Sequence, residues 1–261
     1  MSKGVGYKKL ALALASTALF AAQPAAADTI QLNSFWAGSG SVTIDFTGVN
    51  WHNGAAVNNL HESGGAGGFR TYNLNTDPLR TSPFQSWCVD IFHGFSFVVD
   101  ALDVLKPANI ALAGSSATLP TAFSQQAATD LGRLYTNHHA AVDLTSSSGT
   151  NEAAFQLAIW EIVNERSGSY SLVGGDFKAS GNSAINTLAS TWLNELGTAS
   201  ASQYTASIWT VQSTLTTGHG YAQDVAVFSK MPAVPEPEIY AMFLAGLGLL
   251  GFAARRRSRA G

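Results

Sequence analysis

The stretch from Asn151 to Glu165 reads NEAAFQLAIWEIVNE and is the clearest predicted helix in the chain, so the expected fold is built around it. Thr150 is expected to cap its N-terminus, and Glu152 in the first turn complements the helix dipole. The spacing of Gln156 and Trp160 places both on one face of this helix. The opposite face is expected to meet solvent, and it carries Glu161, Asn164 and Glu165.

Gln156 is therefore a polar residue set into an apolar helix face. A buried primary amide must find hydrogen-bond partners, because leaving it without them costs free energy. Either it caps a buried backbone group, or it has a chemical role that needs a partner elsewhere in the chain.

On both sides of this helix the pattern changes from strands to helices and back. Alternating, β-branched and aromatic segments predict strands, and the remaining apolar repeats predict two more helices. The order predicts an α+β domain, with a β-rich core that is sandwich- or barrel-like and a helical subdomain inserted into it. The expected strands are Thr29 to Trp36, Ser41 to Phe46, Ser86 to Ile91, Phe95 to Val99, Gln203 to Val211 and Ala222 to Phe228, and the further helices are Ala122 to Leu134 and Ala184 to Leu196. The glycine-rich stretch Glu62 to Phe69 lacks the ending of a phosphate loop and is expected to be a turn or a strand with close backbone approach.

The N-terminus has the three regions of a secretory signal peptide. Three lysines come first, an apolar run from Leu10 to Ala22 follows, and small residues precede Asp28. This predicts residues 1–27 as a leader that signal peptidase removes between Ala27 and Asp28. The globular domain is then expected at 28–232, outside the cytoplasm.

The C-terminus is equally ordered. Pro235, Glu236 and Pro237 precede the apolar segment 239–254, and a cluster of arginines follows at 255–257. A helix of that length spans roughly 24 Å, which is marginal for a bilayer. The arginines are expected to stay cytoplasmic. A plain C-terminal anchor would have a similar layout.

This layout resembles the PEP-CTERM sorting signal, over residues 233–261. The matching residues are the triplet Pro235-Glu236-Pro237, the single membrane-sorting helix at 239–254 and the basic residues Arg255, Arg256 and Arg257. The resemblance implies that exosortase, a membrane transpeptidase-like enzyme, processes the chain near the triplet. It also implies a transient membrane anchor, a final place at the cell surface or in the extracellular matrix, and a Gram-negative host that makes an exopolysaccharide biofilm.

Between the two ends the chain is acidic. Residues 28–232 contain seven basic and fifteen acidic residues, for a net charge of −8. Nucleic-acid binding demands basic patches, so this composition argues against it.

Cys88 is the one cysteine of the chain, and it lies in the segment Ser86-Trp87-Cys88-Val89-Asp90-Ile91. It cannot form an internal disulfide, so it is a buried apolar filler, an intermolecular partner or a reactive group. Attack of its thiolate on the carboxamide of Gln156 would expel ammonia and leave an internal thioester. We expect Trp87 and Trp160 to shield such a bond from water, and Asp90 to orient the thiol or take a proton from an incoming amine.

The strings Trp87-Cys88-Val89-Asp90 and Gln156-Leu157-Ala158-Ile159-Trp160 resemble the thioester domains of bacterial surface adhesins. The resemblance implies a Cys88–Gln156 crosslink, a β-rich core with a helical subdomain that carries the glutamine, and covalent attachment to an amine-bearing surface or matrix molecule. Two positions depart from the usual pattern, since a tryptophan precedes Cys88 and Phe155 precedes Gln156.

The sequence therefore predicts an adhesion protein that reacts once and does not turn over, so it is not expected to be an enzyme. The alternative is a non-reactive structural protein associated with exopolysaccharide. No cofactor is expected and no metal site, because His138 and His139 lack ligand-spaced partners and are expected in a polar loop. His93 suggests nothing specific from the sequence.

Overall fold

The computed structural model of the chain describes residues 29–49, 55–94, 97, 101–109, 125–143, 145, 147–165, 169–198, 202–213, 223–231, 242 and 245–247. The predicted leader and its cleavage site at Ala27 and Asp28 lie outside these residues. So do the sorting residues Pro235, Glu236, Pro237 and Arg255–Arg257 and most of the segment 239–254. Among the described residues, no helix is long and apolar enough to cross a membrane.

Six antiparallel strands form a closed barrel, in the order β1-β4-β5-β9-β8-β6. Their bounds are β1 Thr29–Phe35, β4 Phe69–Asn73, β5 Phe84–Cys88, β6 Ala101–Asn109, β8 Tyr204–Ser213 and β9 Val225–Lys230. Side chains that point inward, such as Ile30, Leu32 and Val225, are almost fully buried. The barrel confirms one of the two expected forms of the β-rich core.

A separate three-stranded sheet has the order β3-β2-β7, with β2 at Gly40–Val49, β3 at Ala56–Ala66 and β7 at Phe177–Gly181. Val42, Ile44 and Phe46 alternate with more exposed residues along β2, as expected for a strand with one buried face. The glycine-rich stretch Glu62 to Phe69 was expected to be a turn or a strand, and most of it is strand: its first five residues end β3, and Phe69 begins β4.

Among the described residues, three α-helices lie between β6 and β8 in the sequence: α2 Gln125–His138, α3 Gly149–Asn164 and α4 Ser183–Glu195. The side chain of Ser148 caps α3 by accepting a hydrogen bond from the backbone of Asn151, so Thr150 is not the cap. Asn182 caps α4 in the same way. Together with the barrel, these helices confirm the α+β class.

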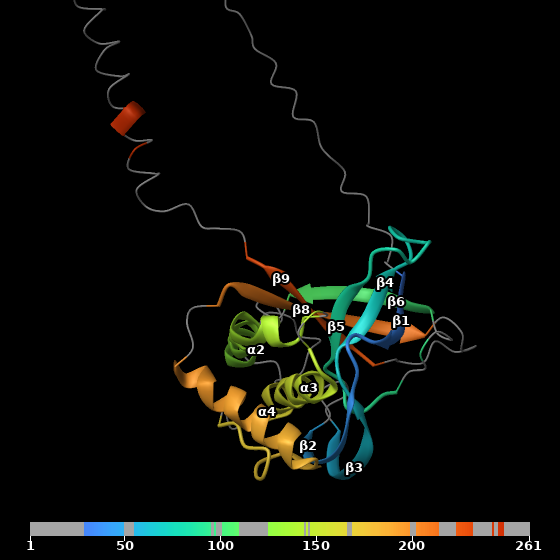
Figure 1. Cartoon of the computed structure of the whole chain (residues 1–261), viewed down its shortest axis with the longest axis vertical. Coiled ribbons are helices and arrows are strands. Elements are labelled where there is room, and N and C mark those ends of the chain that lie inside the picture. Colours follow the sequence, from blue (N-terminus) through green and yellow to red (C-terminus); the bar gives the residue numbers. More distant parts are fainter. Residues whose placement is uncertain are drawn as a thin grey trace, which may run out of the picture.

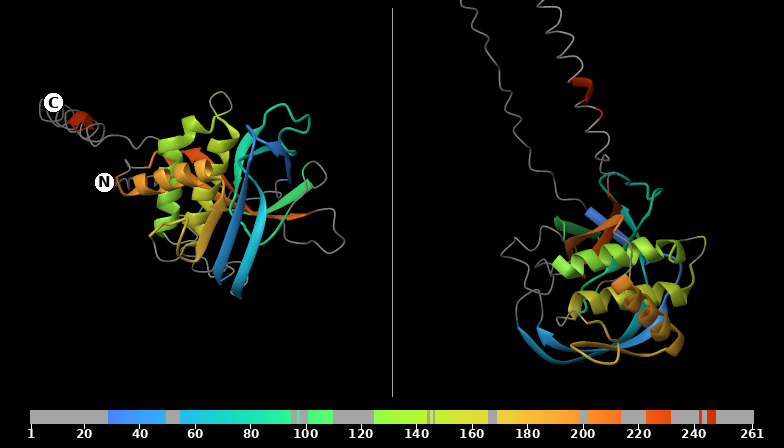
Figure 2. Two further views of the ribbon diagram at one scale, coloured as in Figure 1. Left: turned by 60° about the horizontal axis from the view of Figure 1, so that its bottom comes forward. Right: turned by 90° about the vertical axis from the view of Figure 1, so that its left-hand side faces the viewer.

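Helix α3 occupies the centre of the domain, between the barrel strands and the small sheet (Figure 1). A second view shows α2 and α4 beside it (Figure 2). Every residue from Glu152 to Asn164 is buried, so the helix has no solvated face. A helix that is enclosed all round does not follow the amphipathic pattern of a surface helix.

This enclosure overturns the expected exposure of Glu161, Asn164 and Glu165, which are all buried. Their polar atoms are partly paired with the chain that follows α3. The carboxyl group of Glu161 accepts a hydrogen bond from the backbone of Ser171, and that of Glu165 accepts one from the backbone of Asp176. The expected loop at His138 and His139 is also wrong, because these residues form the end of α2 and the start of the 3-10 helix η1, His139–Ala141.

Candidate functional site

Cys88 and Gln156 meet in the structure, although 68 positions separate them in the sequence. Cys88 is the last residue of β5, and Gln156 lies near the middle of α3. Both side chains are about 1 % exposed. The carboxamide of Gln156 donates from Nε2 to the backbone oxygen of Cys88 at 2.6 Å, and its Oε1 accepts from the Cys88 backbone nitrogen at 3.1 Å. The buried amide is thus paired with the backbone of the cysteine.

Trp160, one helical turn after Gln156, faces the same site. Its indole Nε1 donates to Cys88 Sγ at 3.3 Å. The thiol in turn donates to the backbone oxygen of Asp90 at 3.0 Å. The predicted common face of Gln156 and Trp160 is therefore the face that α3 turns towards the end of β5.

Burial is the main reason why the pKa of the Cys88 thiol is raised well above its ordinary value. The negative charge of Asp90 raises it further, while the hydrogen bond from Trp160 acts in the opposite direction. The thiol is consequently neutral around pH 7. An attack on an amide from this state needs the thiol proton to leave as the new bond forms.

Asp90 is fully buried, and both of its carboxylate oxygens are engaged. Oδ1 accepts from the backbone nitrogen of Phe92 at 2.7 Å, and Oδ2 lies 2.6 Å from Nδ1 of His93. Its backbone oxygen also accepts from the side chain of Gln223 at 3.1 Å. Asp90 thus fixes the position of the segment that follows β5. Its carboxylate contacts His93, which is partly exposed, whereas Asp90 itself is fully buried.

Trp87 lies on the other side of β5 from the thiol. Its ring packs 4.5 Å from that of Phe155, in the core between barrel and helices. It is not among the residues that line the two pockets described below. Of the two tryptophans expected to shield the cysteine, Trp160 contacts the sulfur, whereas Trp87 packs on the opposite face of β5.

Two pockets adjoin the site. The inner pocket has a volume of about 120 Å³, and it is lined by Phe35, Gly65, Ala66, Gly67, Phe69, Cys88, Gln156, Trp160 and Gln223. The outer pocket has a volume of about 590 Å³, and it is lined by Val42, Ile44, Leu60, Glu62, Ser63, Gly64, Gly65, Ile91, Phe92, His93, Gly94, Trp160 and Gln223. Gly65, Trp160 and Gln223 belong to both, so they form the boundary between them.

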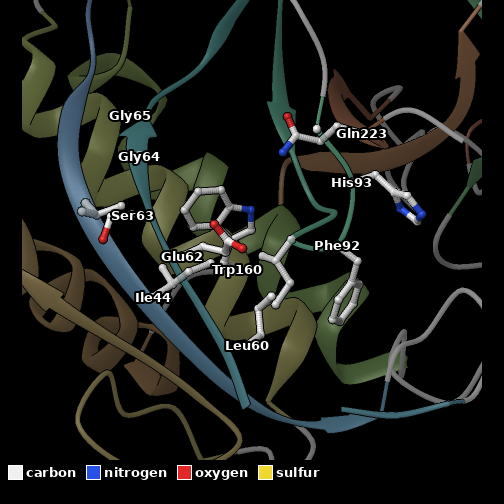
Figure 3. A pocket seen from close by; sticks show the side chains of 13 residues that line it. Ile44, Leu60, Glu62, Ser63, Gly64, Gly65, Phe92, His93, Trp160 and Gln223 are labelled. Carbon is white, nitrogen blue, oxygen red and sulfur yellow. The ribbon is translucent and has the colours of Figure 1, made fainter. Parts of the chain in front are cut away.

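Figure 3 shows the outer pocket, with Trp160 between the strand that carries Ser63 and the segment that carries Phe92 and His93. The sequence did not single out two residues of the site, Gln223 and His93. The spacing of His93 from Asp90, three positions along a turn, could have indicated that pair, but only after the end of β5 at Cys88 was known.

No group of three histidine, cysteine, aspartate or glutamate side chains among the described residues is placed to hold a metal ion.

Comparison with known families matches residues 233–257 to the PEP-CTERM protein-sorting motif. Neither the curated proteins nor the solved structures gave a significant match. The motif includes the predicted triplet Pro235-Glu236-Pro237 and the arginines Arg255–Arg257. It supports processing by exosortase, export, and a cell-surface or extracellular fate for the chain.

Proposed function

We propose that the exported domain forms an internal thioester between Cys88 and Gln156 and uses it to attach covalently to amine-bearing molecules at the cell surface or in the matrix. The observation that carries this proposal is the placement of the Gln156 carboxamide on the backbone of Cys88 by two hydrogen bonds. A held amide beside a buried sulfur is the arrangement that such a reaction needs.

The proposed bond forms by attack of Cys88 Sγ on Cδ of Gln156. The carbon–sulfur bond forms, the carbon–nitrogen bond of the carboxamide breaks, and the thiol proton leaves with the nitrogen as ammonia. The hydrogen bond from Trp160 Nε1 to the sulfur would stabilise the negative charge that develops there. No redox partner or cofactor is required.

Burial supports the survival of the thioester until a partner arrives. The inner pocket is small, and apolar rings of Phe35, Phe69 and Trp160 contribute to its lining. Exclusion of water protects a reactive intermediate from hydrolysis. The protein would react once with an amine and would then remain linked to it, so it would not act as an enzyme.

Export fits this proposed function, because the amine-bearing partner lies outside the cell and the domain must leave the cytoplasm to meet it. We propose that signal peptidase removes residues 1–27 and that exosortase releases the domain from the segment 239–254. Replacing Pro235 and Pro237 by alanine is then expected to leave the full-length chain in the membrane fraction of the native host. If the variant and the unchanged chain are found in the membrane fraction to the same extent and at the same length, processing by this route is contradicted.

A non-reactive matrix protein is the second candidate. It is supported by the same contact, because the two hydrogen bonds satisfy the buried amide of Gln156 and the backbone of Cys88 without any reaction. The neutral thiol is compatible with this function as well.

Incorporation of methylamine separates the two candidates. The purified domain is incubated with methylamine and digested, and the peptide that contains Gln156 is sequenced by mass spectrometry. Covalent adhesion predicts methylamine on the side chain at position 156 in the wild type and none in Cys88→Ala. Absence of label in a wild-type sample that is folded and freshly purified would favour the non-reactive protein.

A further inference from the structure

The outer pocket has an apolar wall, formed mainly by one face of the small sheet. Val42 and Ile44 of β2 and Leu60 of β3 line the pocket from this face. Ile44 lies directly across from Glu62 of β3, so these two side chains point to the same side of the sheet. Ile91 adds a further apolar side chain from the segment that follows β5. Such a wall favours the binding of a hydrocarbon chain, because binding removes apolar surface from water.

One negative charge lies beside this apolar wall. Among the described residues that line the outer pocket, Glu62 carries the one carboxylate, and neither lysine nor arginine is present. The carboxyl group of Glu62 has no ion-pair or hydrogen-bond partner in the described part of the chain. Figure 3 shows Glu62 together with the other side chains that line the pocket. An unpaired carboxylate next to an apolar wall suits a ligand that joins a cation to a hydrocarbon chain.

The same pocket adjoins the proposed thioester. Gly65 and Trp160 line both the outer pocket and the inner one, and the inner lining includes Cys88 and Gln156. Gly65 follows Glu62 by three positions along β3, which corresponds to about 10 Å at the rise of a strand. A ligand that is held at Glu62 must therefore extend over several bonds to reach the boundary between the pockets.

We propose that the outer pocket is the acceptor subsite of the thioester and that it selects a linear diamine. One ammonium group lies at Glu62, the carbon chain lies on the apolar wall, and the second nitrogen is directed towards the inner pocket. This inference rests on the proposed function, for which it names the class of acceptor. A single amine that is held as ammonium at Glu62 could not react, because a protonated nitrogen has no free electron pair. The attacking nitrogen is therefore a second, unprotonated amine group.

The step balances as an acyl transfer. The unprotonated nitrogen of the diamine bonds to Cδ of Gln156, and the bond from Cδ to Cys88 Sγ breaks. The proton that this nitrogen loses ends on the sulfur, which regenerates the thiol of Cys88. The product is an amide at position 156 that still carries the distal ammonium group.

The subsite is tested first without the reaction. Cys88→Ala cannot form the thioester, so binding of amines to this protein reports the pocket alone. The probes are cadaverine, a linear diamine, and pentylamine, which has the same carbon chain but one amine group. Titrations are followed by NMR, and the amide signals of Gly64 and Gly65 show whether the ligand occupies the outer pocket.

We expect cadaverine to bind more tightly than pentylamine, and the preference to fall about fivefold when Glu62→Gln is added, which is the effect of one exposed ion pair. Asp45→Asn is the matched control, because it removes a charge from the same sheet. Asp45 follows Ile44 on β2, so its side chain points to the opposite face, and it does not line the outer pocket. Equal affinities for the two amines, or a preference that Glu62→Gln leaves unchanged, would overturn the inference.

The reaction is tested next, on proteins that retain Cys88 and whose intact mass shows the thioester. We expect the ratio of the cadaverine rate to the pentylamine rate to fall about fivefold in Glu62→Gln and to match wild type in Asp45→Asn. Ionisation of the two amines is the same for every variant, so it cancels in this comparison. The same ratio in wild type and Glu62→Gln would overturn the inference. A missing thioester in the wild type would count against the proposed function, whereas the NMR titration would still decide whether the pocket selects a diamine.

Discussion

The side chain of Gln156 forms two hydrogen bonds with the backbone of Cys88, and through them helix α3 is joined to the end of strand β5. This contact links the helical part of the domain to the barrel. It also places the only cysteine of the chain next to a carboxamide in a buried environment. Single substitutions can show whether this contact only stabilises the fold or also supports formation of the thioester.

Trp160→Phe is expected to keep the ring in place but to lose the hydrogen bond to Cys88 Sγ. A hydrogen bond to a charged group contributes about 1.5–3 kcal/mol, so thioester formation should slow by at least about tenfold. The rate can be followed by intact mass after refolding. Trp209→Phe is the control, because Trp209 packs on Phe84 in the barrel wall. Equal rates for Trp160→Phe and wild type would show that the indole does not assist the sulfur.

Gly68→Ala is expected to destabilise the domain, because the turn between β3 and β4 is packed against α3. A Cβ at position 68 would lie 2.9 Å from Oε2 of Glu152 and 3.0 Å from the ring of Trp87. The same carboxylate accepts a hydrogen bond from the Gly68 backbone. Overpacking of this kind costs roughly 1–3 kcal/mol in the free energy of unfolding.

Gly64→Ala is the matched control for this variant, since an added Cβ there meets no atom within 4 Å. Urea denaturation of the two variants gives the comparison. If both lose the same stability, the close packing at Gly68 is not the cause.

The buried carboxyl of Glu161 predicts a loss of stability as the pH rises. Burial, with a smaller contribution from the charge of Glu165, raises the pKa of Glu161 from 4.5 to about 8. The folded state therefore holds a proton that the unfolded state releases, and its contribution is complete below pH 4.5 and lost by about pH 8. Over that window the loss is on the order of 5 kcal/mol.

Glu161→Gln should remove this dependence, because an amide does not ionise. We expect the variant to be more stable than wild type at about pH 9 and to show a flatter profile between acidic and alkaline solution. Urea denaturation at several pH values measures this, with Glu62→Gln as an exposed control. If the free energy of unfolding depends on pH in the same way for Glu161→Gln and wild type, this carboxyl is not the source of the pH dependence.

Much of the site could be predicted from the sequence, because it depends on short-range patterns. The spacing of Gln156 and Trp160 fixes a common helix face, and the isolated polar residue on that face indicates a buried partner. Both residues do contact Cys88. The barrel closure was one of two expected forms, since alternation within strands does not distinguish a sandwich from a barrel.

Other features depend on the tertiary arrangement, and the sequence did not predict them. Glu161 was expected on a solvated face, but α3 is enclosed on every side by the barrel, the small sheet and the other helices. Asp90 was expected to act on the thiol or the amine, whereas its carboxylate engages Phe92 and His93. The strand β7 pairs with β2 from far along the chain, a pairing that local patterns do not reveal.

The most direct test of the Cys88–Gln156 thioester is the intact mass of the purified, unreduced domain 28–232, measured beside that of Cys88→Ala. If the thioester forms, wild type is lighter than its sequence by one ammonia, whereas Cys88→Ala has its full mass. A wild-type domain with its full mass, a thiol that titrates in denaturant, and an intact glutamine at position 156 would contradict it.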